Sequence, residues 1–151
     1  GAPVEAPGLD LRVLHTPGHS ADSVSFTVSS GGVAGVLTGD TILGSGSTVV
    51  AYPDGRLGPY LHSLARLREL GDVLLLPGHG PVRPDLAAVA GEYLAHRAER
   101  LARVREALAV GAATAREVVE VVYADVDRSL WPAAELSVRA QLAYLADDDG
   151  S

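Results

Sequence analysis

The stretch Leu76-Pro77-Gly78-His79-Gly80 is the key to this sequence, because an apolar run ends there in a tight turn that carries one strong metal ligand. Two earlier segments show the same pattern, in which a glycine turn directly precedes a possible metal ligand. They are His15-Thr16-Pro17-Gly18-His19-Ser20 and Leu37-Thr38-Gly39-Asp40-Thr41. Histidine nitrogen and aspartate oxygen are ligands of hydrolytic zinc sites, and strand ends hold such side chains in fixed positions. His19, Asp40 and His79 are therefore predicted to belong to a metal site.

The composition is that of a folded domain without cysteine. The chain has 151 residues, of which 47% are hydrophobic, and this is enough to build a core. No apolar stretch is long enough to span a bilayer, and the first residues show no signal-peptide pattern, so we expect a soluble, cytoplasmic protein. Because cysteine is absent, any metal must be bound by histidine and carboxylate side chains.

The charge of the chain bears on nucleic-acid binding. The formal net charge of −7 argues against broad, non-specific binding of nucleic acid. One local cluster of arginines stands out, and it consists of Arg97, Arg100, Arg103, Arg105 and Arg116. These residues form either a solvated helix face with ion pairs or a surface that contacts phosphate groups.

Residues 4–40 are predicted to be β-structure. The alternation of Val24, Phe26 and Val28 with serine and threonine is typical of one face of a half-buried strand. The turn signal at 29–32 then predicts a hairpin with the next strand. The expected strands are 9–14, 24–28, 33–37 and, after a glycine-rich loop, 49–52.

A helical period replaces the alternation after residue 60. A leucine at every third position predicts a helix over 60–70, and the apolar run 73–76 that follows predicts a strand buried on both faces. A helix followed by a buried strand indicates an α/β layer. Further helices are expected over 85–110, after the capping-box pattern Thr114–Glu117, and over 132–146, before an acidic tail at 147–150.

Taken in order, Thr-Pro-Gly-His, Thr-Gly-Asp and Pro-Gly-His-Gly resemble the second half of a metallo-β-lactamase-fold hydrolase. The resemblance implies that His19 binds the first of two zinc ions and His79 the second. It also implies that Asp40 bridges both zinc ions and is in this sense catalytic. Each motif also has a simpler interpretation, since Pro-Gly-His is a common turn.

The resemblance continues through 60–67, His96-Arg97 and 122–145. These segments look most like the branch that includes lactamase-β-like protein 2, whose C-terminal helices form a winged-helix-like cap. The implied fold is α/β, with residues 1–92 as the carboxy-terminal half of an αββα sandwich and residues 93–151 as a helical cap. His96 and Arg97 are expected to line the substrate cleft, although His96 also fits a packing role.

One departure from the family is decisive for activity. The motif His-x-His-x-Asp-His is absent, and the only histidines are His15, His19, His62, His79 and His96. One histidine for each metal plus a shared aspartate is too few for tight binding. We therefore expect this chain to be inactive alone, with the amino-terminal half lost or supplied by the same or another chain. The absence of methionine, even at position 1, favours a lost segment.

Three functions remain open at this stage. The arginine-bearing helix and the cap favour a hydrolase in which zinc-activated hydroxide attacks single-stranded RNA. A glyoxalase-II-like thioesterase with a small-molecule substrate is the enzymatic alternative, since one metal core serves several chemistries in this family. A non-enzymatic winged-helix module that binds nucleic acid is the third, and it predicts salt-sensitive binding of duplex DNA without metal.

Overall fold

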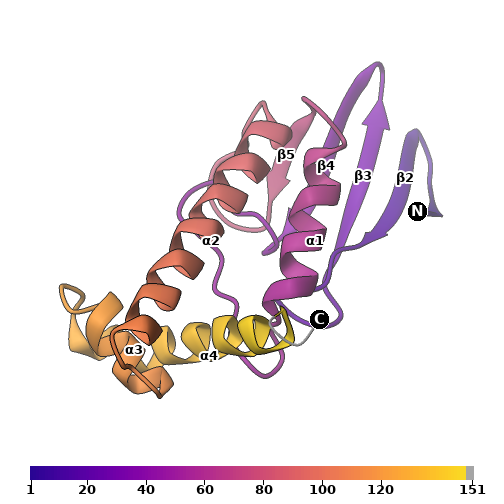
Figure 1. The fold of residues 1–151 in the computed structure, drawn as a ribbon. Helices are drawn as coiled ribbons and strands as arrows, with labels where there is room; N and C mark the ends of the chain where they lie inside the picture. Colours follow the sequence, from indigo (N-terminus) through magenta and orange to yellow (C-terminus); the bar gives the residue numbers. More distant parts are fainter. Residues whose placement is uncertain (149–151) are drawn as a thin grey trace.

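A computed structural model of the chain describes residues 1–148 and shows a five-stranded sheet followed by helices (Figure 1). The strands are β1 (Ala2–Ala6), β2 (Leu9–His15), β3 (Val24–Ser30), β4 (Val33–Gly39) and β5 (Leu74–Pro77). β1 to β4 form an antiparallel meander, and β5 pairs with β4 in parallel. The spatial order is therefore β1-β2-β3-β4-β5. The predicted hairpin of β3 and β4 is confirmed.

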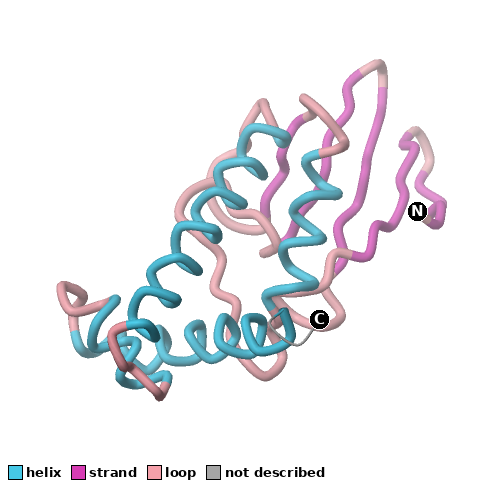
Figure 2. Tube along the Cα trace, viewed as in Figure 1, coloured by secondary structure: helices cyan, strands magenta, loops and turns pink. Residues whose placement is uncertain are grey.

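The helices form one layer on the sheet and a group beside it (Figure 2). They are α1 (Leu57–Arg68), α2 (Leu86–Ala109), α3 (Ala115–Val122), the 3-10 turn η1 (Arg128–Leu130) and α4 (Trp131–Asp148). α1 and α2 lie side by side on one face of the sheet, while α3 and α4 gather at the end of α2, and α4 reaches back to α1. The predicted α/β layer with a helical region after it is confirmed.

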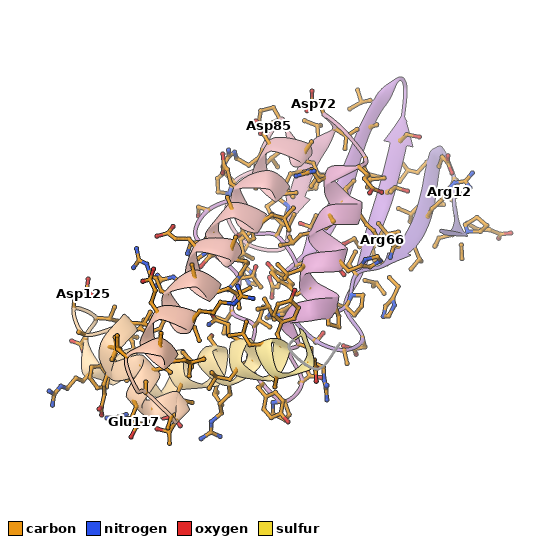
Figure 3. The ribbon with its side chains drawn as sticks, in the orientation of Figure 1. Arg12, Arg66, Asp72, Asp85, Glu117 and Asp125 are labelled. Carbon is orange, nitrogen blue, oxygen red and sulfur yellow. The ribbon has the colours of Figure 1, made fainter. Side chains whose placement is uncertain are left out.

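The core lies between the sheet and α1. The leucine period of α1 places Leu64 and Leu67 on the buried side, and both side chains are fully buried with Val36 of β4 and Leu75 of β5. Burial of one such side chain contributes about 1.5–3 kcal/mol. A hydrogen bond also connects α1 to the end of β2, since Arg66 donates to the His15 carbonyl at 2.9 Å. Figure 3 labels Arg66 on the side of α1 that faces β2.

The other face of the sheet is apolar and open. In the strand register Val13 pairs with Phe26, Phe26 with Leu37, and Leu37 with Leu76, so these four side chains share one face, called here the apolar face. Leu37 is 41% exposed, and no helix of residues 1–148 lies over this face. The sequence predicted burial of the apolar side of β3, but in this structure the helices cover the opposite side. Ser25 is fully buried there, while Val24 is 40% exposed.

Two further expectations differ from the structure. The predicted strand 49–52 is irregular, because its backbone bonds to a helix instead of the sheet, as where Tyr52 N donates to the Leu136 carbonyl at 3.3 Å. β5 is buried on one face only, since Leu74 and Leu76 are partly exposed on the apolar face. In the predicted acidic tail, residues 147 and 148 continue α4, and 149–150 lie outside the described residues.

The helical region begins with the predicted capping box, which is confirmed. Thr114 Oγ1 accepts a hydrogen bond of 3.2 Å from Glu117 N, and the Glu117 carboxylate accepts from Thr114 N at 3.0 Å and from Ala113 N at 2.7 Å. Trp131 at the start of α4 is buried, and its Nε1 donates to the Val126 carbonyl. No helix within residues 1–148 is long and apolar enough to cross a membrane.

Candidate metal centre

Asp40 and His79 meet where β4 and β5 end side by side. Gly39 pairs with Pro77, and Gly78 N donates a hydrogen bond of 2.8 Å to the Gly39 carbonyl. Just beyond, His79 Nδ1 lies 2.6 Å from Asp40 Oδ1. An ionised carboxylate only accepts hydrogen bonds, so Nδ1 carries a proton, and in the neutral ring Nε2 keeps its lone pair. The His79 side chain is 76% exposed, and Nε2 is available to a ligand.

The loops that carry these two residues touch through their backbones. Gly44 N donates a hydrogen bond of 3.0 Å to the His79 carbonyl. A Cβ atom at position 44 would lie 2.0 Å from the Pro81 carbonyl oxygen, which no side chain tolerates. Glycine at 44 therefore allows the loop after Asp40 to hold the loop of His79 in place.

His19 follows β2 in a turn that packs against α1. Gly18 has φ +135°, and a Cβ atom there would lie 2.3 Å from Tyr60 Cα, so glycine is required. His19 Nδ1 lies 2.8 Å from the Val49 carbonyl oxygen. Because a carbonyl only accepts, Nδ1 must be the donor, and in the neutral ring Nε2 keeps its lone pair. This hydrogen bond to a backbone carbonyl is the usual way in which metal-binding histidines are oriented.

These donors fit a metal such as zinc in kind but not in number. Two imidazole Nε2 atoms and one carboxylate are suitable ligands. However, no three His, Asp or Glu side chains within residues 1–148 come close enough together to hold one metal ion. The structure brings Asp40 and His79 into contact and places His19 in a separate turn. A complete site needs further ligands.

His96 and Arg97, the two predicted substrate residues, have different surroundings. His96 is half-buried and borders a hollow formed with Gly46, Ser47 and Tyr93. Burial, with smaller contributions from the neighbouring Arg97 and Arg100 charges, lowers the pKa of His96 below its ordinary value. Its contact with a substrate stays a prediction.

Arg97 lies inside the fold, with only 9% of its surface exposed. Its Nη2 donates to the Thr48 carbonyl, and its guanidinium lies 5.2 Å from the centre of the Tyr60 ring. The reason is its position on α2, where Tyr93, Arg97, Leu101 and Val104 form the buried stripe. Arg97 is thus nearly buried, and its contact with a substrate, like that of His96, stays a prediction.

The sequence analysis did not identify a set of polar side chains that hold the loop 41–50 by hydrogen bonds to backbone carbonyls. Tyr60 Oη donates to the Thr41 carbonyl at 2.8 Å, and Tyr93 Oη donates to the Gly46 carbonyl at 3.0 Å. Burial raises the pKa of Tyr60 to about 12, so the phenol stays protonated and donates. Thr48 Oγ1 donates to the Asp40 carbonyl at 2.8 Å. The signal in the sequence was the spacing of Tyr93 and Arg97, four residues apart on an apolar helix stripe.

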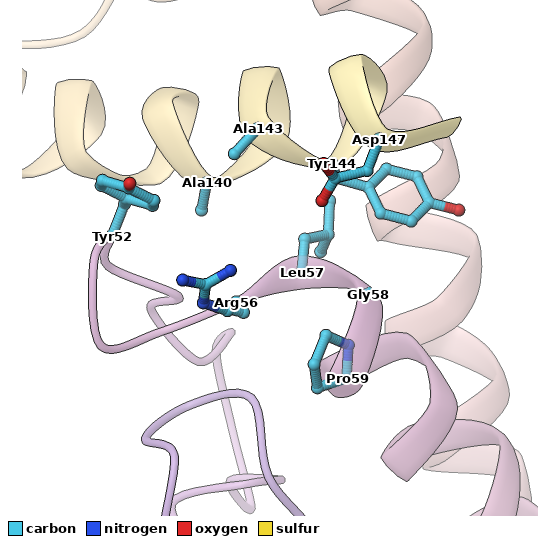
Figure 4. Close-up of a pocket in the computed structure, with 9 residues that line it drawn as sticks. All are labelled: Tyr52, Arg56, Leu57, Gly58, Pro59, Ala140, Ala143, Tyr144 and Asp147. Atoms are coloured by element: carbon cyan, nitrogen blue, oxygen red, sulfur yellow. The ribbon is translucent and has the colours of Figure 1, made fainter. Parts of the chain in front are cut away.

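A cavity of about 270 Å³ lies where α4 meets the start of α1 (Figure 4). Tyr52 and Arg56 approach it from the segment before α1, and Ala140 faces it from α4. Arg56 also borders a neighbouring hollow formed with Pro17 and other residues of the turn before His19. The cavity therefore lies against the helical region, and the hollow next to it is lined by Pro17 and Gly18, the two residues before His19.

The other arginines of the predicted cluster have partners on the helices. Arg103 lies 2.6 Å from Glu99, and Arg116 lies 3.2 Å from Glu120. The Arg100 guanidinium lies 5.0 Å from the centre of the Tyr123 ring. These contacts favour the interpretation as a solvated, ion-paired helix face.

A sheet that ends in Asp40 and His79, with helices on one face, is the kind of layer found in metallo-β-lactamase folds. The chain belongs to the Metallo-beta-lactamase superfamily, which residues 1–79 match. Residues 114–149 match the Beta-lactamase associated winged helix domain. The chain is similar to the Beta-lactamase-like protein 2 homolog of Drosophila melanogaster, with 34% identity over 146 residues, which are 91% of this chain and 46% of that protein. The predicted family, branch and fold class are thus confirmed.

The chain is also similar to a fungal protein and to a solved bacterial structure. The chain is 34% identical over 137 residues to the Atrochrysone carboxyl ACP thioesterase of Aspergillus chevalieri, covering 83% of this chain and 42% of that protein. It also resembles the crystal structure of a metallo-beta-lactamase family protein from Thermus thermophilus. That likeness has a TM-score of 0.76 and 29% identity and covers 99% of this chain and 48% of the other. The chain spans about half the length of the curated relatives it matches.

Proposed function

We propose that this chain supplies part of the active site of a metal-dependent hydrolase and that His19, Asp40 and His79 bind the metal there. Members of the superfamily are typically hydrolases. The observation that carries the proposal is the contact of Asp40 with His79 across the ends of two parallel strands. Such a pair on rigid elements is the arrangement that metal binding needs.

The proposed metal is zinc, and each residue has a defined task. His19 and His79 present Nε2, because their Nδ1 atoms donate to the Val49 carbonyl and to Asp40. Asp40 supplies a carboxylate whose second oxygen is not used by His79. Zinc bound in such a site acts as a Lewis acid and lowers the pKa of water toward about 7.

The remaining ligands come, in this proposal, from residues that this chain does not contain. Support comes from the apolar face, where Phe26 and Leu37 lie in the row that a second sheet layer would cover. Further support is that the chain spans about half of its curated relatives. By itself the chain is then an inactive part of the hydrolase.

Single-stranded RNA is the proposed substrate. The cavity at α4 combines the Arg56 cation with the rings of Tyr52 and Tyr144, and this combination suits a phosphate group beside a flat base. Arg56 also borders the neighbouring hollow lined by Pro17 and Gly18, and in this proposal the substrate extends from the cavity through that hollow toward His19.

A thioester is the second candidate substrate, and the name of the Aspergillus relative supports it. A module that only binds duplex DNA is less well supported. The net charge is −7, and Arg103 and Arg116 are engaged with Glu99 and Glu120.

Zinc binding by the purified protein, which is expected to be weak because ligands are missing, tests the ligand assignment, with isothermal titration calorimetry at high protein concentration as the readout. Asp40→Asn and His79→Ala should each weaken zinc binding at least about tenfold, because each removes a donor of a sparse set. His62→Ala, on the exposed side of α1, is the matched control and should bind as the wild type does. Equal zinc affinity in all variants would refute the assignment.

The substrate is tested after a segment with the His-x-His-x-Asp-His motif has been fused ahead of Gly1. Cleavage of a single-stranded RNA oligonucleotide is compared with hydrolysis of an acyl-glutathione thioester. Preference for RNA that disappears in Arg56→Met supports the proposed substrate class. Preference for the thioester, unaffected by Arg56→Met, supports the second candidate.

A further inference from the structure

The orientation of His19 depends on a single carbonyl in a loop without regular structure. Val49 O accepts the hydrogen bond from His19 Nδ1, and residues 41–50 form no strand or helix. The loop is instead held from outside by the side chains of α1 and α2 described above. The contact nearest to Val49 is made by Arg97 of α2, which donates a hydrogen bond to the carbonyl of the preceding residue, Thr48.

Arg97 is an unusual choice for this place. A buried cation loses its hydration, and the loss is usually offset by a carboxylate partner. The Arg97 guanidinium, within the described part of the chain, donates to a backbone carbonyl and stacks on the Tyr60 ring, and its buried Nε has no partner. The buried guanidinium therefore indicates that its hydrogen bond to the Thr48 carbonyl has a specific role.

Arg97 bonds to the peptide unit that directly precedes the one carrying the Val49 carbonyl. A hydrogen bond to the Thr48 carbonyl fixes the plane of the peptide between 48 and 49. On the other side of Val49, the Val50 side chain is 2% exposed and anchors the chain in the core. The Val49 carbonyl is thus held from both sides and directed at His19 Nδ1. Without this acceptor, the proton of neutral His19 is free to reside on Nε2, and that atom then offers no lone pair to a metal.

We propose that Arg97 is a positioning residue which, by fixing the Thr48–Val49 backbone, holds His19 in the Nδ1–H tautomer with Nε2 ready for the metal. The role as a metal-site residue rests on the proposed function, but the control of the tautomer does not need a metal. In this role Arg97 acts through the backbone.

Long-range ¹H–¹⁵N NMR correlations of the protein report which ring nitrogen of His19 carries the proton. Wild type should show the Nδ1–H tautomer. Arg97→Met keeps the packing volume and removes the donor, so a mixture of both tautomers is expected, while Arg97→Lys keeps a donor and should restore Nδ1–H. Arg103→Met, at an exposed site on the same helix, is the matched control. If Arg97→Met does not fold, Arg97→Gln is measured in its place, since its amide is too short to reach Thr48.

Zinc affinity, measured on the same samples by calorimetry, should fall about 10–100-fold in Arg97→Met and recover in Arg97→Lys. A folded Met or Gln variant with the wild-type tautomer overturns the inference, as does a wild-type protein with His19 in the Nε2–H form. A tautomer change with unchanged zinc affinity supports the inference but removes His19 from the proposed ligands. An unchanged tautomer together with zinc loss in His19→Ala leaves the proposed function standing and overturns only the role of Arg97.

Discussion

His79 Nδ1 lies 2.6 Å from Asp40 Oδ1 although 39 residues separate them in the chain. The contact is a consequence of topology. β4 and β5 are parallel neighbours, α1 forms the connection between them, and both strands therefore end at the same edge of the sheet. Each strand end is followed at once by its ligand, so strand pairing alone places the two side chains together.

Gly44→Ala should destabilise the protein by about 1–3 kcal/mol, because the new Cβ would lie 2.0 Å from the Pro81 carbonyl oxygen. The same change should weaken zinc binding, since the loops of Asp40 and His79 must separate. Gly91→Ala is the matched control. Its Cβ has no neighbour nearer than 4.0 Å and lies in α2, so a gain of about 0.5–1 kcal/mol is expected. Urea denaturation measures both, and a neutral Gly44→Ala contradicts the role of this loop contact.

Thr114→Ala should lower the free energy of unfolding by about 1 kcal/mol, because the side-chain acceptor for Glu117 N is lost at the start of α3. Thermal unfolding of the variant against wild type measures this. Arg103→Ala removes an exposed ion pair with Glu99 in α2, so it serves as the comparison and should change stability less. A loss in Thr114→Ala no larger than that in Arg103→Ala would argue against the cap.

Glu117→Gln should show a stability loss that depends on pH. Hydrogen bonds from Ala113 N and Thr114 N lower the pKa of Glu117 below its ordinary value of 4.5. A lowered pKa means that the folded state binds the proton less well than the unfolded state, so the stabilisation is present above pH 4.5 and is lost as the pH falls through the lowered pKa. The difference between wild type and variant should therefore be seen at about pH 7 and vanish in acid. An equal difference at both pH values would contradict the capping role of the charge.

His96→Gln should make the stability less sensitive to mild acid. The pKa of His96 is lowered from 6.5, chiefly by burial. The unfolded state consequently takes up the proton at higher pH, so His96 contributes stability above pH 6.5 that is lost as the pH falls through the lowered value. Urea midpoints at about pH 7.5 and about pH 5.5 measure the effect. The urea midpoint of the wild type should fall more between these two pH values than that of His96→Gln. Equal falls in both proteins would contradict the prediction.

Leu37→Ser should reduce self-association of this chain with little cost in stability, because Leu37 is 41% exposed on the apolar face. Sedimentation velocity over a range of protein concentrations measures the association. Val110→Ser, at a site 77% exposed at the end of α2, removes a similar apolar surface away from the sheet and should leave association unchanged. Equal effects of the two changes would show that association does not involve the apolar face.

Helices and strands with a strong local pattern were predictable from the sequence. Which side of a strand is buried was harder to predict. The leucine period indicated α1, and Thr114 with Glu117 indicated the start of α3. Alternation in β3 marked an apolar side correctly, but no local pattern tells which side the helices of the same chain will cover. Residues 49–52 have β-propensity, yet the hydrogen-bond partner of Tyr52 N lies in α4, and tertiary contacts override such a propensity.

The candidate site was predictable in part for the same reason. Asp40 and His79 follow strands that pair, so motifs at strand ends come together as soon as the sheet forms. Arg97 could not be placed by motif, because a charged residue beside His96 was interpreted as surface-facing. Its helical spacing from Tyr93 and Leu101 is what directs it into the interior.

The order of the strands has a consequence for how the chain folds. Since the spatial order β1-β2-β3-β4-β5 repeats the order along the chain, every strand pairs with the one that was made just before it. The connections within β1 to β4 are short and close at low entropic cost, whereas the connection from β4 to β5 includes α1 and closes later. The sheet can therefore grow strand by strand as the polypeptide leaves the ribosome, and the meeting of Asp40 with His79 is its last step.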